Sequence, residues 1–421
     1  MTQLIQLKYE KKVVTPKIIL VEREKVMLAV SCNSKLTSVE GEGQVMKLKL
    51  MLLLLVFALV MAPVISGCAP ADEVAPEPEP DPNGEPDEEP EEDAQSFTFE
   101  FATFWPAGDF QVAEGHKAWA QEISDRVSAE TPHTVDFEWH YAQALLGMTE
   151  LYEGTAQGVA DIATTCPAYT PGVFPLTEAF ELPGYNNDNA LVASVTMHEG
   201  WKQSELLQEE YSDVKILHFW ATGPGDFMTT VPVSSMEDLQ GLDIRAVGGT
   251  IPWVSALGAN PVSMGMGASY EAIETGVVDG LLAPTDTLEG FRLAEVLNYV
   301  TKSPGAYNII FMKVMNWDSW NSLPASVQQI FDEVNEKYVI EYGQLRTDYT
   351  VLGQQYGVEE HGMEVIELDP DEYQRWVDLI DPIMEEWVEK ANTAGLPGQE
   401  MVDMVRDLDA QFSAQYGGYG N

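Results

Sequence analysis

The chain has 421 residues, 45% of them hydrophobic, which is enough for two or three globular domains. It carries 22 Lys and Arg against 68 Asp and Glu, so its formal net charge is -46. Such an acidic surface repels phosphate backbones, which excludes nucleic acid as an expected partner and favours solubility in a salty medium. The three cysteines and six scattered histidines have no zinc-site spacing, so neither a metal nor a cofactor is expected.

Residues 46–67 predict a secretory signal peptide. A short basic stretch, Lys-Leu-Lys, precedes an almost entirely apolar run from Leu50 to Ala62, and small residues follow. The apolar run is too short for a membrane span, which needs about 20 residues. Because Met46 begins a conventional signal by itself, we interpret residues 1–45 as a mis-assigned upstream extension.

The four residues Ile65-Ser-Gly-Cys68 resemble a bacterial lipobox, in which the cysteine is acylated and becomes the first residue after cleavage. Acyl chains on Cys68 would bind the protein to a membrane; plain secretion is the alternative. Residues 68–96 continue as a Pro- and acid-rich stretch with almost nothing apolar to bury, which predicts an extended tether. We therefore expect an exported, lipid-anchored protein in the periplasm or on the outer face of the cell membrane.

From residue 96 the pattern becomes that of a globular domain. Phenylalanines alternate with polar residues, and helical and strand periodicities then follow in turn. The predicted elements are a strand at 97–101, a helix at 110–129, a strand at 135–139, a helix at 147–157 and a strand at 159–163. This order predicts an α/β layer with a parallel sheet.

The middle of the chain repeats this alternation, and the last part is helical. The predicted elements are strands at 214–220, 242–247, 261–264 and 277–282, a short helix whose capped start is 235–238, and helices at 251–257, 268–275, 324–349, 370–393 and 398–414. Two α/β lobes followed by long helices predict a bilobal architecture, and clefts at lobe interfaces are where small ligands bind.

Three ordered motifs lie between residues 231 and 290. They are Pro232-Val…Glu-Asp-Leu-Gln-Gly-Leu-Asp-Ile-Arg245, then Gly258-Ala-Asn-Pro-Val262, then Tyr270-Glu-Ala-Ile-Glu-Thr-Gly-Val-Val-Asp-Gly280; a fourth segment, Asn316…Trp320-Asn-Ser-Leu-Pro324, follows. With these motifs the chain resembles the extracytoplasmic solute receptors of TRAP (tripartite ATP-independent periplasmic) transporters, of the dicarboxylate-receptor type. The resemblance extends over about residues 97–400.

The resemblance implies a two-lobe, periplasmic-binding-protein-like (type II) α/β fold with a hinge and C-terminal helices. One lobe would comprise residues 97–224 and about 311–349, and the other residues 225–310 and about 350–421. Such a receptor closes around a small carboxylate and then docks on the membrane subunits of a TRAP permease, which an ion gradient drives. The resemblance implies no enzymatic activity.

The resemblance implies that Arg245 is the residue that binds the ligand. Its planar guanidinium matches the two oxygens of a carboxylate and stays charged when buried. A surface or structural salt bridge is the alternative role for an arginine at this position.

The chain departs from the family pattern at two places. Many members have a second arginine shortly before the Pro-Val stretch, where this chain reads Gly223-Pro-Gly-Asp-Phe-Met228, and many have Asn where this chain has Ala283. The resemblance thus implies a pocket with one cation and one polar contact fewer than usual. That argues against sialic-acid-like and C4-dicarboxylate ligands, and we expect a monocarboxylate with an apolar or aromatic tail.

Other candidate ligand-binding residues are placed by the rule that ligands of open α/β sheets bind beyond the carboxyl ends of strands. They are Trp105, Tyr141, Gln143, Thr165, Tyr169, Phe227, Trp253, Asp286 and Tyr307. Each has a purely structural alternative, as a core side chain, a turn residue or a solvated carboxylate.

Three other classes of protein remain as alternatives. A binding protein of an ATP-driven importer or of a sensor would share the anchor, the tether and the lobes. A secreted hydrolase would need catalytic motifs, and the chain has neither a Gly-x-Ser-x-Gly nor a His-Glu-x-x-His sequence. An adhesive lipoprotein would show repeats or β-rich patterning.

Overall fold

The computed structural model describes residues 93–185, 189–304 and 307–417. The chain divides into two units, Met1–Asp87 and Glu88–Asn421, and the architecture below is that of the second. The predicted upstream extension, signal peptide and lipidated Cys68, and nearly all of the tether, lie outside the described residues.

The first sheet, here called sheet A, has five strands. In order across the sheet they are β2 (Thr134–His140), β1 (Ser96–Thr103), β3 (Ile162–Thr165), β10 (Ile310–Met315) and β4 (Lys215–Ala221). The parallel pairing predicted for the first three strands is confirmed, because β1 runs parallel to both β2 and β3. Strand β10 has no counterpart in the predicted elements, and it runs antiparallel to β3 and β4. The sheet is therefore mixed.

The second sheet, sheet B, has six short strands. Their order is β11 (Glu364–Ile366), β9 (Tyr299–Thr301), β5 (Asp226–Thr229), β8 (Gly280–Ala283), β6 (Asp243–Ala246) and β7 (Asn260–Ser263). Strand β6 is parallel to β7 and β8, as the alternation of strand and helix predicts. Strand β5 is antiparallel to its neighbours β8 and β9.

Two short segments that connect the sheets lie side by side. One joins β4 to β5 and the other joins β9 to β10, and the backbone N–H of Thr222 donates to the carbonyl of Ile309 at 2.9 Å. Gly225 is needed here, because a Cβ at this position would lie 2.1 Å from the ring of Tyr307. This hydrogen bond and this close contact hold the two connecting segments together.

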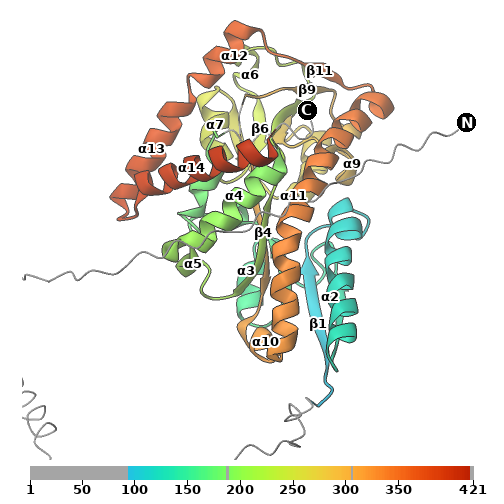
Figure 1. Ribbon diagram of the computed structural model, residues 1–421. Helices are drawn as coiled ribbons and strands as arrows, with labels where there is room; N and C mark the ends of the chain where they lie inside the picture. The colour runs from blue at the N-terminus through green and yellow to red at the C-terminus, as the bar shows by residue number, and fades with distance from the viewer. Residues whose placement is uncertain (1–92, 186–188, 305–306, 418–421) are drawn as a thin grey trace, which may run out of the picture. The chain divides into compact units, whose positions relative to one another are not determined.

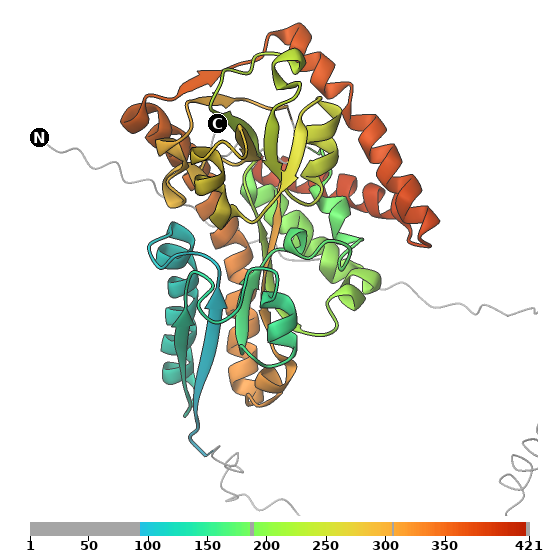
Figure 2. The same ribbon diagram turned by 180° about the vertical axis from the view of Figure 1, so that it is seen from behind.

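Helices cover both sheets (Figure 1). Those associated with sheet A are η1 (Gln111–His116), α2 (Lys117–Glu130), α3 (Leu151–Ala156), α4 (Ala190–Gln203), α5 (Glu205–Glu210) and α10 (Trp317–Asn321), with short η2 (Pro167–Tyr169) and η3 (Thr177–Glu181). Those associated with sheet B are α6 (Met236–Leu239), α7 (Thr250–Ala256), η4 (Met266–Ala268), α8 (Ser269–Glu274), α9 (Thr287–Gly290) and η5 (Leu293–Glu295). Viewed from behind, β1 and β2 lie beside α2 (Figure 2).

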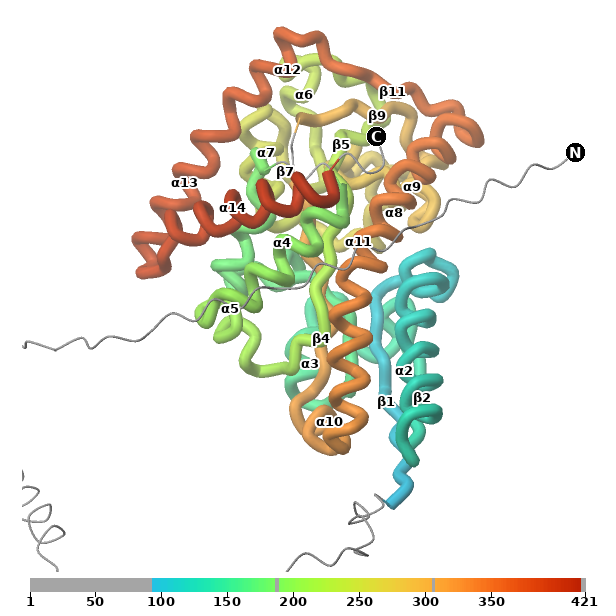
Figure 3. Tube along the Cα trace, viewed as in Figure 1, coloured from blue at the N-terminus to red at the C-terminus, as the bar shows by residue number. Residues whose placement is uncertain are grey.

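The longest helix, α11 (Ala325–His361), contacts α2, α4 and β4 on the side of sheet A and α9 on the side of sheet B. The C-terminal helices are α12 (Pro370–Val377), α13 (Ile380–Thr393) and α14 (Gly398–Tyr416), and α14 returns to lie against α4 (Figure 3). Helix α11 therefore extends twelve residues beyond its predicted end at 349, and the helix predicted at 370–393 is two helices.

The predicted cap is confirmed, because the side chain of Ser235 accepts the N–H of Asp238.

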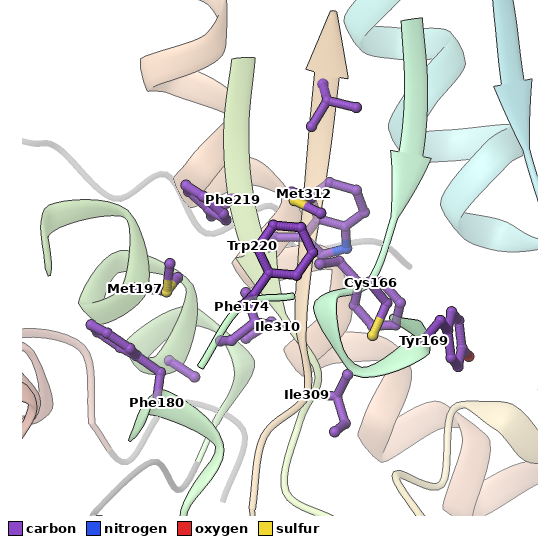
Figure 4. Packing of buried hydrophobic residues seen from close by; sticks show 14 of the residues in the cluster. Cys166, Tyr169, Phe174, Phe180, Met197, Phe219, Trp220, Ile309, Ile310 and Met312 are labelled. Atoms are coloured by element: carbon purple, nitrogen blue, oxygen red, sulfur yellow. The ribbon is translucent and has the colours of Figure 1, made fainter. Parts of the chain in front are cut away.

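The core of sheet A is mainly aromatic. Phe219 and Trp220 lie on β4 with Met312 of β10 beside them, and Cys166 and Tyr169 follow the end of β3 (Figure 4). Burial raises the pKa of the Cys166 thiol well above its usual range, so this cysteine is an unreactive core residue.

Lys313 is fully buried in this core on β10. Its Nζ lies 3.6 Å from the centroid of the Trp119 ring and has no hydrogen-bond partner in the described part of the chain. Burial holds the pKa of Lys313 well below its usual value of 10.5, and burial is also the chief reason that the pKa values of the neighbouring histidines His116 and His218 are held well below theirs. The Lys313 amine is therefore a cost to folding, because a buried polar group without a hydrogen-bond partner destabilises the folded state.

We expect Lys313→Met to raise the free energy of unfolding by roughly 1–3 kcal/mol at pH 7. The unfolded chain keeps this amine protonated below its ordinary pKa, whereas the folded protein does not, so the parent loses stability as the pH falls from 9 to 7. Chemical denaturation at pH 9 and pH 7 should show that the free energy of unfolding changes less with pH in the variant than in the parent. Lys390→Met, at an exposed lysine, is the matched control and should change neither quantity; a variant less stable than the parent would contradict the account.

Candidate ligand-binding cleft

A small cleft is lined by residues that follow strands of both sheets. Most of its wall is apolar and aromatic: Phe104, Trp105, Phe110, Val247, Met266, Ala283, Pro284, Phe291, Ile309 and Phe311. The polar lining is Asp109, Gln111, Tyr169, Thr222, Arg245, Asp286, Thr287, Tyr307 and Arg346. An apolar concavity with a few converging polar groups is typical of a small-molecule site.

Strand ends bring these side chains together. Trp105 follows the end of β1, Tyr169 follows β3, and Asp286 follows β8, while Arg245 lies near the end of β6. The carboxyl ends of parallel strands share one edge of a sheet, where ligands of α/β proteins bind. The cleft is therefore built where the two sheets present such edges.

Arg245 is almost completely buried, with 2% of its surface exposed. Its Nε donates to the backbone carbonyl of Met264 at 3.0 Å, and its side chain is hydrogen-bonded with Tyr169. Burial raises the pKa of the Tyr169 hydroxyl to about 12, against the opposing charge of Arg245. Among the described residues no carboxylate forms an ion pair with Arg245. A buried cation without a counter-charge is costly, so the arrangement favours binding of an anion.

Half of the ten predicted ligand-binding side chains lie in the cleft: Arg245, Trp105, Tyr169, Asp286 and Tyr307. The ring of Trp105 stacks on Phe104 at a centroid distance of 3.9 Å, and the hydroxyl of Tyr307 donates to the carbonyl of Leu282 at 2.9 Å. Both aromatic side chains are thus fixed wall residues.

Three of the other predicted residues are buried away from the cleft. Phe227 and Trp253 are fully buried, and each packs edge-on against Trp376. Thr165 is buried on β3, opposite Met312 of β10. The rule of strand ends identifies the right edge of the sheet but does not say to which face a side chain points, and these three point into the core.

Tyr141 and Gln143 also lie outside the cleft. Tyr141 stacks parallel to Trp139 at a centroid distance of 5.8 Å. Gln143 has a left-handed backbone, with φ of 65°, and its Oε1 accepts the N–H of Met148 at 3.0 Å. Gln143 thus shapes the loop after β2 and lines a neighbouring hollow together with Phe104.

Arg346 is the most important residue that the sequence patterns missed. It lies on α11, is 2% exposed and lines the cleft, where its Nη2 is 3.0 Å from Oδ2 of Asp286. The expectation of a single cation in the pocket is therefore wrong, because a long helix supplies the second one rather than the loop before β5. Asp286 neutralises it, so Arg245 is still the cleft arginine without an acidic partner in the described part of the chain.

Helix α11 reaches this site because of one glycine. A Cβ at Gly353 would lie 2.2 Å from the carbonyl oxygen of Thr285 and 2.7 Å from Cα of Asp286. The hydroxyl of Thr285 donates to the carbonyl of Thr350 on the same helix at 2.6 Å. The backbone of α11 therefore packs directly on the loop that carries Asp286, which places Arg346 against it.

Two buried acids accompany Arg346. Burial raises the pKa of Asp286 to about 7, with Arg346 lowering it and Asp109 raising it. Burial also raises the pKa of Asp109 to about 6, although the N–H of Gln111 donates to Oδ1 of Asp109 at 2.9 Å and Arg346 favours the charged form. Near neutral pH this pair of acids can hold or release a proton.

A second, larger hollow has residues from both sheet regions in its lining, including Glu181, Gly249 and Trp387. Burial raises the pKa of Glu181 to about 8, and this carboxyl accepts the N–H of Ile310 at 3.1 Å and of Gly249 at 3.4 Å. The one basic residue in the lining, Lys390, is 76% exposed at its side chain. The smaller cleft contains the buried Arg245, whereas the larger hollow has only an exposed lysine, so the smaller cleft is the better candidate for binding an anion.

Within the described ranges one group of three residues could offer ligand atoms to a metal ion: Glu100, Glu138 and His140, on β1 and β2. None of the three lines the cleft, and Glu100 and His140 already contact each other. No helix in the described part of the chain is long and apolar enough to cross a membrane.

Residues 101–391 match the model of a family described as bacterial extracellular solute-binding protein, family 7. One curated relative is the C4-dicarboxylate-binding periplasmic protein DctP of Vibrio cholerae, 27% identical over 41% of this chain and 52% of that protein, so the match spans about half of that relative. Another is the ectoine-binding periplasmic protein TeaA of Halomonas elongata, 23% identical over 71% of this chain and 87% of that protein.

Two solved structures resemble the described body closely. One is a TRAP solute-binding protein from a marine metagenome, specific for aromatic acid ligands and in complex with metahydroxyphenylacetate; it has 26% identity and a TM-score of 0.70 over 75% of this chain and 99% of that one. The other, from Rhodoferax ferrireducens and in complex with copurified benzoate, has 27% identity and a TM-score of 0.70 over 76% and 99%. The matched family model and these folds agree with the motifs around Arg245. The chain belongs to bacterial extracellular solute-binding protein family 7, and it is a TRAP-type solute-binding protein with the two-lobe type II fold.

Proposed function

We propose that this protein is an extracytoplasmic receptor that binds a small organic carboxylate in its cleft through Arg245 and delivers it to a TRAP membrane permease. The observation that carries the proposal is the burial of Arg245 in an aromatic cleft, without an acidic partner among the described residues. A carboxylate would supply the missing counter-charge and would match the planar fork of the guanidinium. The protein would bind its solute without changing it chemically.

The cargo that fits best is a monocarboxylate with an aromatic body. Arg346 is already neutralised by Asp286, so one cleft arginine in the described residues is available for a ligand carboxylate. Phe104, Trp105 and Phe311 supply flat apolar walls. The relatives that bind metahydroxyphenylacetate and benzoate support this class of ligand.

Delivery would depend on closure of the two lobes. We place one lobe at residues 97–224 and about 311–349 and the other at residues 225–310 and about 350–421, with the paired crossings at Thr222 and Ile309 as part of the hinge. Arg245 and Tyr169 come from opposite sheets, so a ligand that bridges them would favour the closed form, which the permease would recognise. The predicted signal peptide and acylated Cys68 would hold the receptor outside the cytoplasm beside that permease.

A thermal-shift screen of the purified protein tests the proposal. The panel pairs benzoate with benzamide and phenylacetate with phenylacetamide, and adds succinate and glucuronate. An acid at a hundred times its dissociation constant should stabilise the protein by about 2.7 kcal/mol, while the matched neutral amide should have almost no effect. If no acid stabilises the protein, or if the amides match the acids, then the cleft is not a carboxylate site.

A further inference from the structure

The cleft contains a second group of polar residues besides Arg245. It consists of Asp109, Gln111, Asp286 and Arg346, here called the acid–amide end. Building on the proposed carboxylate site at Arg245, we propose that the acid–amide end receives a hydrogen-bond donor of the same ligand, so that the cargo is an aromatic acid bearing a hydroxyl or a protonated amine.

Buried acceptors without partners are the first observation behind this proposal. Among the described residues Oε1 of Gln111 has no hydrogen-bond partner, and Oδ2 of Asp286 has none beyond its ion pair, at 3.0 Å, with Nη2 of Arg346. Both residues are at most 3% exposed and both line the cleft. Leaving a buried acceptor unsatisfied costs about 1–3 kcal/mol, which a donor on the ligand would recover.

The separation of the two charged groups is the second observation. In the described residues Asp286 pairs with Arg346 and not with Arg245, whereas Arg245 is engaged by Tyr169 and by the carbonyl of Met264. Aromatic and apolar residues make up most of the remaining lining. A ligand that satisfies both groups therefore needs a carboxylate, a flat apolar body and a donor.

The electrostatics of the acid–amide end distinguish the two kinds of donor. Asp286 and Asp109 have pKa values raised to about 7 and about 6, chiefly by burial, and the charged groups facing them are each other and Arg346. A ligand ammonium would stabilise both carboxylates and release a proton when it binds near pH 6.5. A ligand hydroxyl would donate to Asp286 without adding charge, so little proton release should accompany it.

The test compares ligand pairs rather than single affinities. Calorimetry would measure benzoate, 3-hydroxybenzoate, 3-methoxybenzoate and 3-(aminomethyl)benzoate against the parent protein. We expect the hydroxyl or the aminomethyl compound to bind at least about tenfold more tightly than benzoate, and the methoxy compound, which lacks a donor, to show no such gain. Titrations in two buffers of different ionisation enthalpy identify the donor, because the amine alone should release protons.

Two variants separate recognition from structural damage. In Asp286→Asn and in the milder Asp109→Asn, the ratio of the affinity for the preferred donor-bearing acid to the affinity for benzoate should fall by about tenfold, whatever the change in benzoate affinity itself. Asp125→Asn, at an exposed carboxylate of α2, is the matched control and should keep the preference of the parent. A loss of affinity shared equally by all ligands would mean only structural damage and would overturn the assignment.

The two proposals fail in different ways. If benzoate binds through Arg245 but no donor-bearing acid is preferred, the acid–amide end does not contact the ligand and only this inference is overturned. If none of the acids binds, the carboxylate site itself is refuted, and this inference is refuted with it.

Discussion

Replacing Arg245 with alanine is expected to weaken binding of the cargo acid by about a hundredfold or more. Removing one partner of a buried, hydrogen-bonded charge pair costs roughly 2–5 kcal/mol, and in this cleft the ligand carboxylate would lose its only unneutralised cation among the described residues. Arg245→Lys keeps the charge but lacks the planar fork, so it should fall between the parent and the alanine variant. Titration calorimetry with the best acid from the screen measures all three.

The stability of the empty protein gives a second readout for Arg245. A buried arginine without a counter-charge destabilises the ligand-free state, so Arg245→Met should unfold at a temperature equal to or above that of the parent. Arg126→Ala, at a surface arginine paired with Glu130 and Glu333, is the matched control and should leave ligand affinity unchanged. An Arg245 variant that binds as tightly as the parent would contradict the assignment.

Replacing Arg346 with methionine is expected to destabilise the fold by roughly 3–5 kcal/mol at pH 8.5, because Asp286 would stay buried without its cation. The effect should shrink at pH 6. The pKa of Asp286 is already about 7 and would rise further in the variant, so at pH 6 the folded protein holds this proton and avoids the buried charge. Chemical denaturation at the two pH values measures the difference.

A double variant tests the cause of that effect. In Arg346→Met with Asp286→Asn the buried charge is gone, so much of the stability lost at pH 8.5 should return. Arg126→Met is the surface control and should cost less than about 1 kcal/mol at either pH. A loss in Arg346→Met that is equal at both pH values and unchanged in the double variant would show that packing, not charge, explains the role of Arg346.

The sequence patterns led to Arg245 and several aromatic residues of the candidate cleft, but not to Arg346 or Asp109. The motif ending in Ile244-Arg245 pointed to an arginine that is buried in the cleft, and the ends of β1, β3 and β8 suggested Trp105, Tyr169 and Asp286, which also line it. These residues could be found because strand ends and family motifs are local features of the chain.

Arg346 could not be found in the same way, because it belongs to a helix distant from every motif. A usable signal existed nevertheless. Tyr338, Tyr342 and Arg346 follow one another at intervals of four residues on the buried face of α11, and an arginine on a buried helical stripe is unusual. Asp109 was missed because it lies in a loop with no periodicity.

The fold was predictable where periodicity is strong and misjudged where tertiary contacts decide. The parallel strands β1, β2 and β3 follow from alternation, whereas β10 reads as one more apolar run and pairs antiparallel between β3 and β4. Apolar periodicity predicts a helix at 324–349, and glycines such as Gly353 and Gly357, which disfavour helices, follow in the part that was not predicted. The structure explains Gly353, because another backbone lies too close for any side chain.

The most direct measurement is a crystal structure of the protein with the tightest acid found in the screen. We expect both carboxylate oxygens to lie about 2.7–2.9 Å from the guanidinium nitrogens of Arg245, with the ring of the ligand between the aromatic walls of the cleft. A carboxylate bound at Arg346 instead, or an acid bound outside the cleft, would contradict this expectation.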